Sequence, residues 1–177
     1  HNGTVYRWNR ACYGITDGKP HLRIENRVLP SGPTVVDEIA NAAFWYGLVA
    51  GLADEYRDVS EHIEFDEARY NFTAAARNGL ASQFKWLDGS NRPAHELILD
   101  TLIPLAERGL ESSDVDAEDI DRYLGIIQKR VETQQTGSQW QLDSLARMQD
   151  VGSRAERLGA LTRAMVERQK EGDPVHE

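Results

Sequence analysis

Two arginines and a glutamate alternate along one short segment of the chain. Arg23, Glu25 and Arg27 lie two residues apart within His21–Val28, and alternate residues of a strand point to the same face of a sheet. A carboxylate supplies a hard oxygen ligand for a divalent metal, and a guanidinium donates paired hydrogen bonds to phosphate or carboxylate oxygens. The pattern therefore predicts a charged strand face suited to a metal-bound, anionic reactant. The alternative is a solvated sheet face, where cross-strand Arg and Glu pairs are common.

We expect this segment to pair with an earlier strand. Thr4–Arg10 is rich in β-branched and aromatic residues, and Gly14–Pro20 supplies turn residues between the two segments. Two antiparallel strands are the predicted result. If Arg7 faces the same side of the sheet as Arg23, three arginines surround Glu25.

A long helix is predicted to follow the charged strand. Leu29–Pro33 contains two prolines and a glycine and so ends the strand, and Thr34 with Asp37 three residues later is typical of a helix N-terminus. The helix is expected from Val35 to about Tyr56. Its apolar surface is broad enough to predict burial against a sheet and other helices, with its aromatic side chains in the core.

The rest of the chain predicts mostly helices. We expect Pro104 to kink or end a helix that opens near Pro93, because proline lacks the backbone N–H that a helix interior needs. The last helices are expected to serve as a scaffold or an oligomer surface, and His1 and His176 to be disordered. The other expected segments are a helix over Phe65–Leu80, an extended piece over Gln83–Leu87, a connector over Glu111–Asp116, an amphipathic helix through Ile120, Tyr123, Leu124, Ile127 and Val131, a helix around Gln139–Val151 and a last one through Leu158, Leu161 and Met165. The predicted fold class is α+β, a short antiparallel β-sheet piece followed by a mostly helical bundle.

Composition and charge exclude several classes of protein. The chain has 177 residues, of which 40% are hydrophobic, enough for one good core. Residues 1–30 carry a net charge of +3 and the remainder −12, which suggests a local anion site and argues against nucleic acid as a partner. Cys12 is the only cysteine, so an intrachain disulfide framework and a thiolate metal cage are excluded. We find neither a long apolar run nor a signal-peptide pattern, and expect a soluble, cytoplasmic protein with no membrane contact.

Other chemical motifs are scarce. The sequence has no GxxxxGK[ST] phosphate loop and no GxGxxG. His95 and Glu96 are not followed by the second histidine that a zinc-protease helix needs. His21, His62 and His95 are too scattered to define a metal site.

The RIENR segment, Arg23–Arg27, resembles the RxExR strand of the glutamine synthetase catalytic fold. The wider stretch, YRWNR before the strand and the Pro33–Thr34 helix start after it, is more similar to the glutamate-cysteine ligase and carboxylate-amine ligase family, which shares that fold. The similarity covers about the first 80 residues, Glu67–Leu80 included. It implies an ATP-dependent ligase that phosphorylates the γ-carboxylate of glutamate and lets an amine attack the acyl phosphate.

By this resemblance the charged strand is the catalytic one. Glu25 would be a ligand of Mg²⁺ or Mn²⁺, and Arg27 would contact the transferred phosphoryl group or the substrate carboxylate. Arg23 and Arg7 are assigned to nucleotide phosphate or to orienting Glu25. Fixed positive charge would offset the repulsion between two anionic reactants. The expected cofactors are ATP and the metal, and the substrates are glutamate and an amine, with cysteine expected.

The sequence also departs from glutamine synthetase. Val28-Leu-Pro replaces the usual Pro-Asp after Arg27, and the Asn-Pro-Tyr-Leu turn is absent, which argues against ammonia as the amine. The earlier part of the fold, with the remaining carboxylate ligands, is also missing. We therefore expect residues 1–110 to be the C-terminal part of a ligase catalytic domain, residues 111–177 to be a helical extension, and the chain to be inactive without the N-terminal half of the same protein.

Two other functions fit the residues. The first is a noncatalytic helical interaction module whose hairpin caps a bundle; it predicts no metal dependence and tolerance of Glu25→Gln. The second is an anion-binding regulatory module, which predicts that this chain binds phosphate or nucleotide by itself. Self-association of the terminal helices is a further expectation, since they are long and amphipathic.

Overall fold

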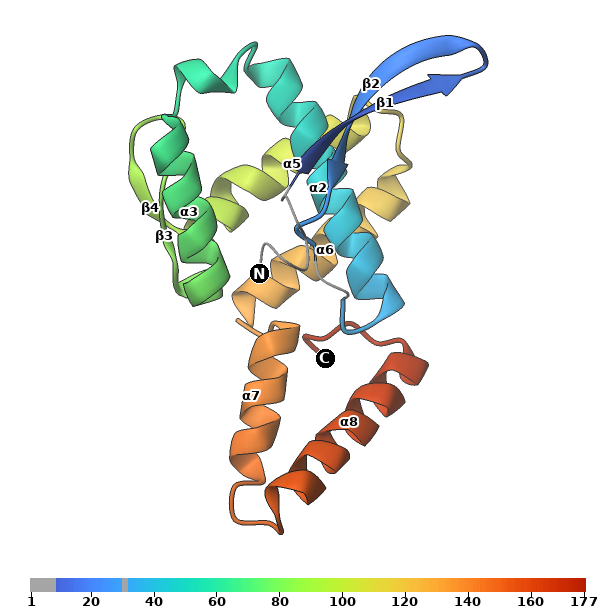
Figure 1. Cartoon of the computed structure of the whole chain (residues 1–177), viewed down its shortest axis with the longest axis vertical. Helices are drawn as coiled ribbons and strands as arrows, with labels where there is room; N and C mark the ends of the chain where they lie inside the picture. The colour runs from blue at the N-terminus through green and yellow to red at the C-terminus, as the bar shows by residue number, and fades with distance from the viewer. Residues whose placement is uncertain (1–8, 30–31) are drawn as a thin grey trace. The chain divides into compact units, whose positions relative to one another are not determined.

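The computed structural model describes residues 9–29 and 32–177, which form two compact units divided between residues 31 and 32. The first unit is a β-hairpin and the second is mainly helical, with one short β-hairpin (Figure 1). The α+β class and the order of a sheet piece followed by helices are confirmed. In the described part of the chain, none of the helices has the length and apolar character needed to span a membrane.

The first hairpin pairs β1 (Asn9–Thr16) with β2 (Lys19–Asn26). Its turn is Asp17–Gly18, and both residues have positive φ, 52° and 75°, as a two-residue type I′ turn requires. The prediction of a turn over Gly14–Pro20 was therefore too wide, and the first strand ends six residues later than expected. Residues 4–8 of the predicted first strand lie outside the described residues.

Gly14 belongs to β1 because of its cross-strand neighbour. It pairs with His21, and a Cβ at this position would lie 2.6 Å from His21 Nε2. The absence of a side chain lets the imidazole lie over the strand. A glycine that looks like a turn residue in the sequence thus serves close packing within the sheet.

The helical unit is built around α2 (Val35–Glu55), and its first residues confirm the predicted cap. Thr34 Oγ1 accepts a hydrogen bond of 3.3 Å from the backbone N–H of Asp37. The apolar surface of α2 is covered only in part: Ala40 is buried, but Ile39 and Val49 are exposed. The predicted burial against other helices is therefore confirmed only in part, since Ala43, Phe44 and Leu48 do pack against the core.

Three helices, α2, α5 (Ile103–Glu111) and α6 (Ala117–Glu132), enclose the main core (Figure 1). Gly47 of α2 and Gly109 of α5 bring two backbones together, since a Cβ on Gly109 would meet the carbonyl oxygen of Gly47. The periodicity predicted for α6 is confirmed by four buried residues: Ile120, Leu124, Ile127 and Val131. Because α6 shares the core of α2 and α5, residues 110 and 111 do not separate two compact units.

Pro104 does not end its helix. α4 (Ala94–Leu97), a π-helical turn η3 (Ile98–Leu102) and α5 follow one another directly. The wide turn precedes the proline, which lies in the first turn of α5, where its missing N–H costs little. The expected kink or end is therefore replaced by a local change of helix type.

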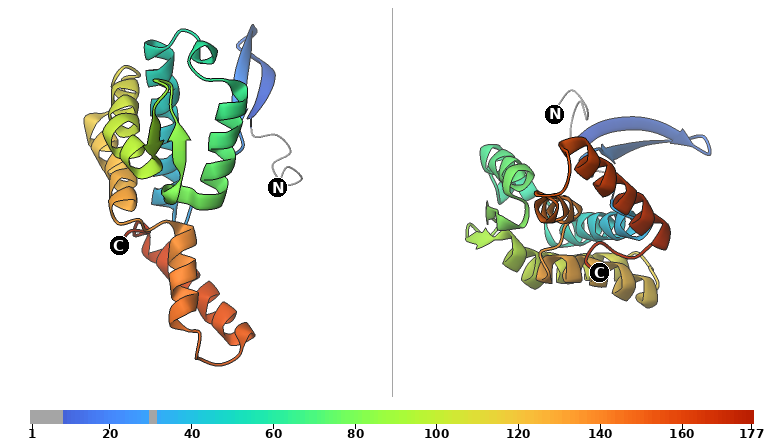
Figure 2. Two further views of the ribbon diagram at one scale, coloured as in Figure 1. Left: turned by 90° about the vertical axis from the view of Figure 1, so that its left-hand side faces the viewer. Right: turned by 90° about the horizontal axis from the view of Figure 1, so that it is seen from below.

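The remaining elements surround this core. α7 (Gly137–Arg147) and α8 (Arg154–Glu171) meet at the loop that joins them and diverge from it, and this loop is the part of the pair that lies farthest from α2, α5 and α6 (Figure 1 and Figure 2). Contrary to the expected disorder at His176, the chain end is packed: Val175 is buried, and its N–H donates to Asp37. His1 lies outside the described residues. The elements not yet given are η1 (Val59–Glu61), α3 (Phe65–Asn78), η2 (Gly79–Ala81), β3 (Gln83–Lys85) and β4 (Asn91–Pro93).

Candidate functional site

The first hairpin separates charged and apolar residues onto opposite faces. The register pairs Arg10 with Glu25 and Cys12 with Arg23, and alternation places all four side chains on one face. The other face carries apolar side chains that are strongly exposed, Leu22 by 82% and Ile24 by 60%. The hairpin thus presents a charged face able to bind ions and an apolar face that the hairpin itself does not cover.

Glu25 is the centre of the charged face. Arg10 Nη2 lies 2.7 Å from Glu25 Oε2, and Arg27 Nε donates to Glu25 Oε1 at 3.2 Å. The Cys12 thiol also donates to Oε2, at 3.7 Å. The side chains of Glu25 and Arg10 are 37% and 55% exposed, so a small ligand can reach the pair from solvent.

The surroundings keep Glu25 ionised. Partial desolvation raises the pKa of this carboxyl, but the charges of Arg10 and Arg27 and hydrogen bonds from Arg10 and Cys12 together outweigh it, so the pKa is lowered. At neutral pH the site is therefore a carboxylate between two guanidiniums. Such a group can accept hydrogen bonds or coordinate a cation, and it does not act as a proton donor.

The structure brings together only part of the predicted set. Glu25 and Arg27 are in contact, whereas Arg23 lies on the same face and makes no ion pair or hydrogen bond with any described residue. Arg7 lies outside the described residues. Arg10, which the sequence analysis did not assign, contacts Glu25 as well.

One signal in the sequence does locate Arg10. In a hairpin whose two-residue turn is Asp17–Gly18, each residue of one strand pairs with a fixed partner on the other. Counting outward from this turn places Arg10 opposite Glu25. The Asp-Gly pair was therefore the informative feature, and the β-branched residues upstream were not.

The described residues fit the predicted metal only in part. Glu25 is the kind of oxygen donor that Mg²⁺ or Mn²⁺ takes, but a guanidinium already holds each of its oxygens. Among the described residues no group of three or more His, Cys, Asp or Glu side chains could hold a metal ion. A metal bound at Glu25 would need further ligands from residues beyond those described. The arginines fit a phosphate or carboxylate better.

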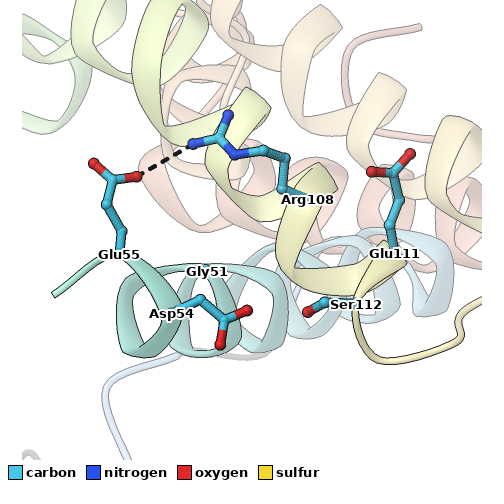
Figure 3. A pocket seen from close by; sticks show the side chains of 6 residues that line it. All are labelled: Gly51, Asp54, Glu55, Arg108, Glu111 and Ser112. Atoms are coloured by element: carbon cyan, nitrogen blue, oxygen red, sulfur yellow. Dashed lines mark hydrogen bonds and ion pairs between the residues drawn. The ribbon is translucent and has the colours of Figure 1, made fainter. Parts of the chain in front are cut away.

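Two open pockets lie in the helical unit. The larger, about 520 Å³, is lined by Gly51, Asp54 and Glu55 of α2 and by Arg108, Glu111 and Ser112 at the end of α5. Figure 3 shows Arg108 directed at Glu55, an ion pair of 3.3 Å, with the Asp54 and Glu111 carboxylates beside it. Three carboxylates and one guanidinium repel an anionic ligand. The smaller pocket, about 380 Å³, lies beside the Glu67–Lys85 ion pair.

A second acid–arginine cluster is buried inside the helical unit. Asp37 Oδ1 accepts from Arg130 Nη2 at 2.7 Å, and Oδ2 accepts from Thr34 Oγ1 at 3.0 Å and from the Val175 N–H at 3.1 Å. Arg130 Nη1 donates to Asn41 at 2.6 Å. This cluster joins the start of α2 to α6 and to the chain end, and its acceptors are already occupied. It is structural.

Comparison with protein-family models, curated proteins and solved structures found no match for this chain. Evidence on the function of this chain therefore comes from its geometry and from the resemblance of the RIENR and YRWNR segments. On geometry alone, the charged face of the first hairpin is the candidate site for an anionic reactant, because it offers exposed guanidiniums and an ionised carboxylate together.

Proposed function

We propose that this chain is the C-terminal part of an ATP-dependent carboxylate-amine ligase of the glutamate-cysteine ligase type. The observation that carries the proposal is the ionised Glu25 held between Arg10 and Arg27 on a face open to solvent. Of the residues that the family resemblance assigns to the reaction, Glu25 and Arg27 are in contact there and Arg23 lies on the same face; Arg7 lies outside the described residues. The substrates are glutamate and an amine, with cysteine the amine that the resemblance favours.

The chain's own contribution to this reaction is electrostatic. Arginine side chains bind the oxygens of phosphate and carboxylate groups, and their fixed charge lowers the repulsion between two anions that must come together. A divalent metal, when bound, would neutralise further phosphate charge. Glu25, kept ionised by its neighbours, would supply one oxygen ligand after one of the two guanidiniums that hold its oxygens moves away.

The exposed apolar face of the hairpin is a reason to propose that a further part of the protein covers it and completes the site. An antiparallel sheet of this kind buries one face, and a two-stranded hairpin by itself is marginally stable. Leu22, Ile24 and Tyr13 are exposed on the face opposite to Glu25. We assign their cover, and the missing metal ligands, to the N-terminal half of the same protein; this chain alone is then inactive.

The test is turnover by the intact protein. With glutamate, cysteine, ATP and Mg²⁺, ADP release is expected, and Glu25→Gln is expected to abolish most of it. The matched control is Lys19→Met, which also changes one charge on the same hairpin but lies beside the turn. Turnover that survives Glu25→Gln would contradict the site. The absence of turnover with every amino acid would contradict the ligase and favour a helical interaction module.

A second candidate, an anion-binding regulatory module, is favoured by one observation. Arg23 is exposed, and no described residue forms an ion pair or hydrogen bond with it, so the described part of the chain leaves its donors to an anion. This function requires the 177-residue chain alone to bind phosphate or ATP, with Arg23→Met removing the binding. Isothermal titration with phosphate and with ATP separates it from the ligase, whose site needs the N-terminal half.

A further inference from the structure

The three arginines around Glu25 differ in how they are engaged. Arg27 is two residues from Glu25 and holds Oε1, while Arg10 comes from the opposite strand and holds Oε2. A carboxylate held at both oxygens from two directions has little freedom to rotate. Its orientation then depends on the pairing of β1 with β2, because Arg10 and Glu25 are direct partners in the ladder.

Arg23 lies on the same face but remains outside this arrangement. It pairs with Cys12, one step closer to the turn on the same face, and no described residue forms an ion pair or hydrogen bond with it. Its guanidinium is exposed, and no described residue occupies its five donors. Among the described arginines of this face, it is therefore the one that can take an incoming oxyanion without first breaking a contact with a described residue.

The geometry points to a positioning role for Arg10, which orients Glu25 from the neighbouring strand, whereas Arg23, which the resemblance assigns to nucleotide phosphate, remains outside this support. This inference rests on the proposed ligase function and adds to it a residue that the sequence pattern did not assign. Arg27 completes the support of Glu25. Preorganisation matters here because a misplaced catalytic carboxylate loses rate even when the substrate still binds.

Steady-state kinetics of the intact protein separate the two roles. Arg10→Met is expected to lower kcat by about tenfold or more with little change in the KM for glutamate, since a displacement of catalytic groups costs rate. Arg10→Lys should recover most of the rate, because an ammonium can still reach Oε2. Arg23→Met should raise the KM for glutamate or ATP by about tenfold, since a charge-assisted hydrogen bond is lost. Lys19→Met is the charge-matched control.

Two results would overturn the inference. The first is an unchanged kcat in Arg10→Met, and the second is a change of KM in Arg10→Met that matches the one in Arg23→Met. Either would mean that Arg10 binds substrate or is a bystander. If the wild-type protein shows no turnover at all, the proposed function fails, and a measurement that needs no activity still decides the role of Arg10.

That measurement is side-chain ¹⁵N NMR of the arginines in the intact protein, in which the hairpin has its cover. A guanidinium held by a carboxylate rotates slowly about its Nε–Cζ bond, and a solvated one rotates fast. Arg10 is expected to give separate Nη signals that merge in Glu25→Gln, whereas Arg23 gives averaged signals in both proteins. Averaged signals for Arg10 in the wild-type chain would show that it does not hold Glu25 and would overturn the inference independently of the ligase activity.

Discussion

Two acid–arginine clusters in this chain use the same chemistry in opposite surroundings. Asp37 is fully buried and its partner Arg130 is 14% exposed, whereas Glu25 and Arg10 remain open to solvent. Besides Thr34 at the N-cap of its own helix, Asp37 contacts Arg130 of α6 and Val175 at the chain end, both distant in sequence. Burial and completed hydrogen bonds make the first cluster part of the fold, and exposure leaves the second free to bind a ligand.

The contrast has an energetic basis. A buried ion pair contributes little net stability, but the removal of one partner leaves an uncompensated charge in a medium of low dielectric. An exposed pair is screened by water and salt, so either member can be lost with little effect on folding. The same substitution, loss of an arginine, should therefore destabilise one cluster and impair only the chemistry of the other.

The largest effect is expected from Arg130→Met. Asp37 would keep the hydrogen bonds from Thr34 and Val175 but would lose its only cationic partner among the described residues. The expected loss is roughly 3–5 kcal/mol of unfolding free energy, measured by urea denaturation followed by circular dichroism. The double variant with Asp37→Asn should regain part of it, because the buried charge is then removed. A loss below about 1 kcal/mol would contradict the structural role of the cluster.

Gly109→Ala tests the close approach of α2 and α5. The added methyl group would meet the Gly47 carbonyl oxygen and lie 2.5 Å from the Gly51 backbone nitrogen. These are backbone atoms that cannot move aside, so overpacking should cost about 1–3 kcal/mol. Gly125→Ala in α6 is the matched control: a Cβ there meets nothing within 4 Å, and the better helix propensity should stabilise by up to about 1 kcal/mol. Equal urea midpoints for the two variants would refute the tight contact.

Local signals predicted much of the helical unit. Thr34 and Asp37 gave the start of α2 because capping involves residues close in sequence. The spacing of Ile120, Leu124 and Val131 gave α6 because its period shows which face is buried. The N-cap of α2 and the buried face of α6 each depend on residues close together in one helix, so a sequence pattern can predict them.

Other features depend on residues that are distant along the chain, and the sequence analysis missed them. The Asp37–Val175 contact joins residues near the two ends of the helical unit's sequence, and no local sequence pattern predicts such a contact. The partner of Glu25 depends on the register of the hairpin. A turn placed a few residues away pairs every residue of one strand with a different residue of the other. For this reason the prediction missed Arg10, which together with Arg27 holds the carboxylate among the described residues.

Glu25→Gln should leave stability almost unchanged, in contrast to Arg130→Met. Both ion pairs of Glu25 are exposed, and glutamine keeps nearly the same size while it can still accept a hydrogen bond. The urea midpoint of the 177-residue chain is expected to match that of the wild type within experimental error. A shift as large as that of Arg130→Met would show that the hairpin cluster is structural, and the distinction between the two clusters would be lost.

The smallest effect is expected on the stability of the chain at low pH. It comes from a third ion pair, Glu67 with Lys85, which is partly exposed. A hydrogen bond from Lys85 is the main cause that lowers the pKa of Glu67. The unfolded chain therefore binds this proton more readily than the folded one. The stabilisation is complete above the ordinary glutamate pKa of about 4.3 and is lost as pH falls through the lowered value. Thermal midpoints from pH 7 to pH 3 should thus fall less steeply in Glu67→Gln than in the wild type.

Asp121→Asn is the control, because Asp121 has no ion pair or hydrogen bond with the described residues. If Asp121→Asn flattens the curve as much as Glu67→Gln does, the effect comes from overall charge and not from the Lys85 contact.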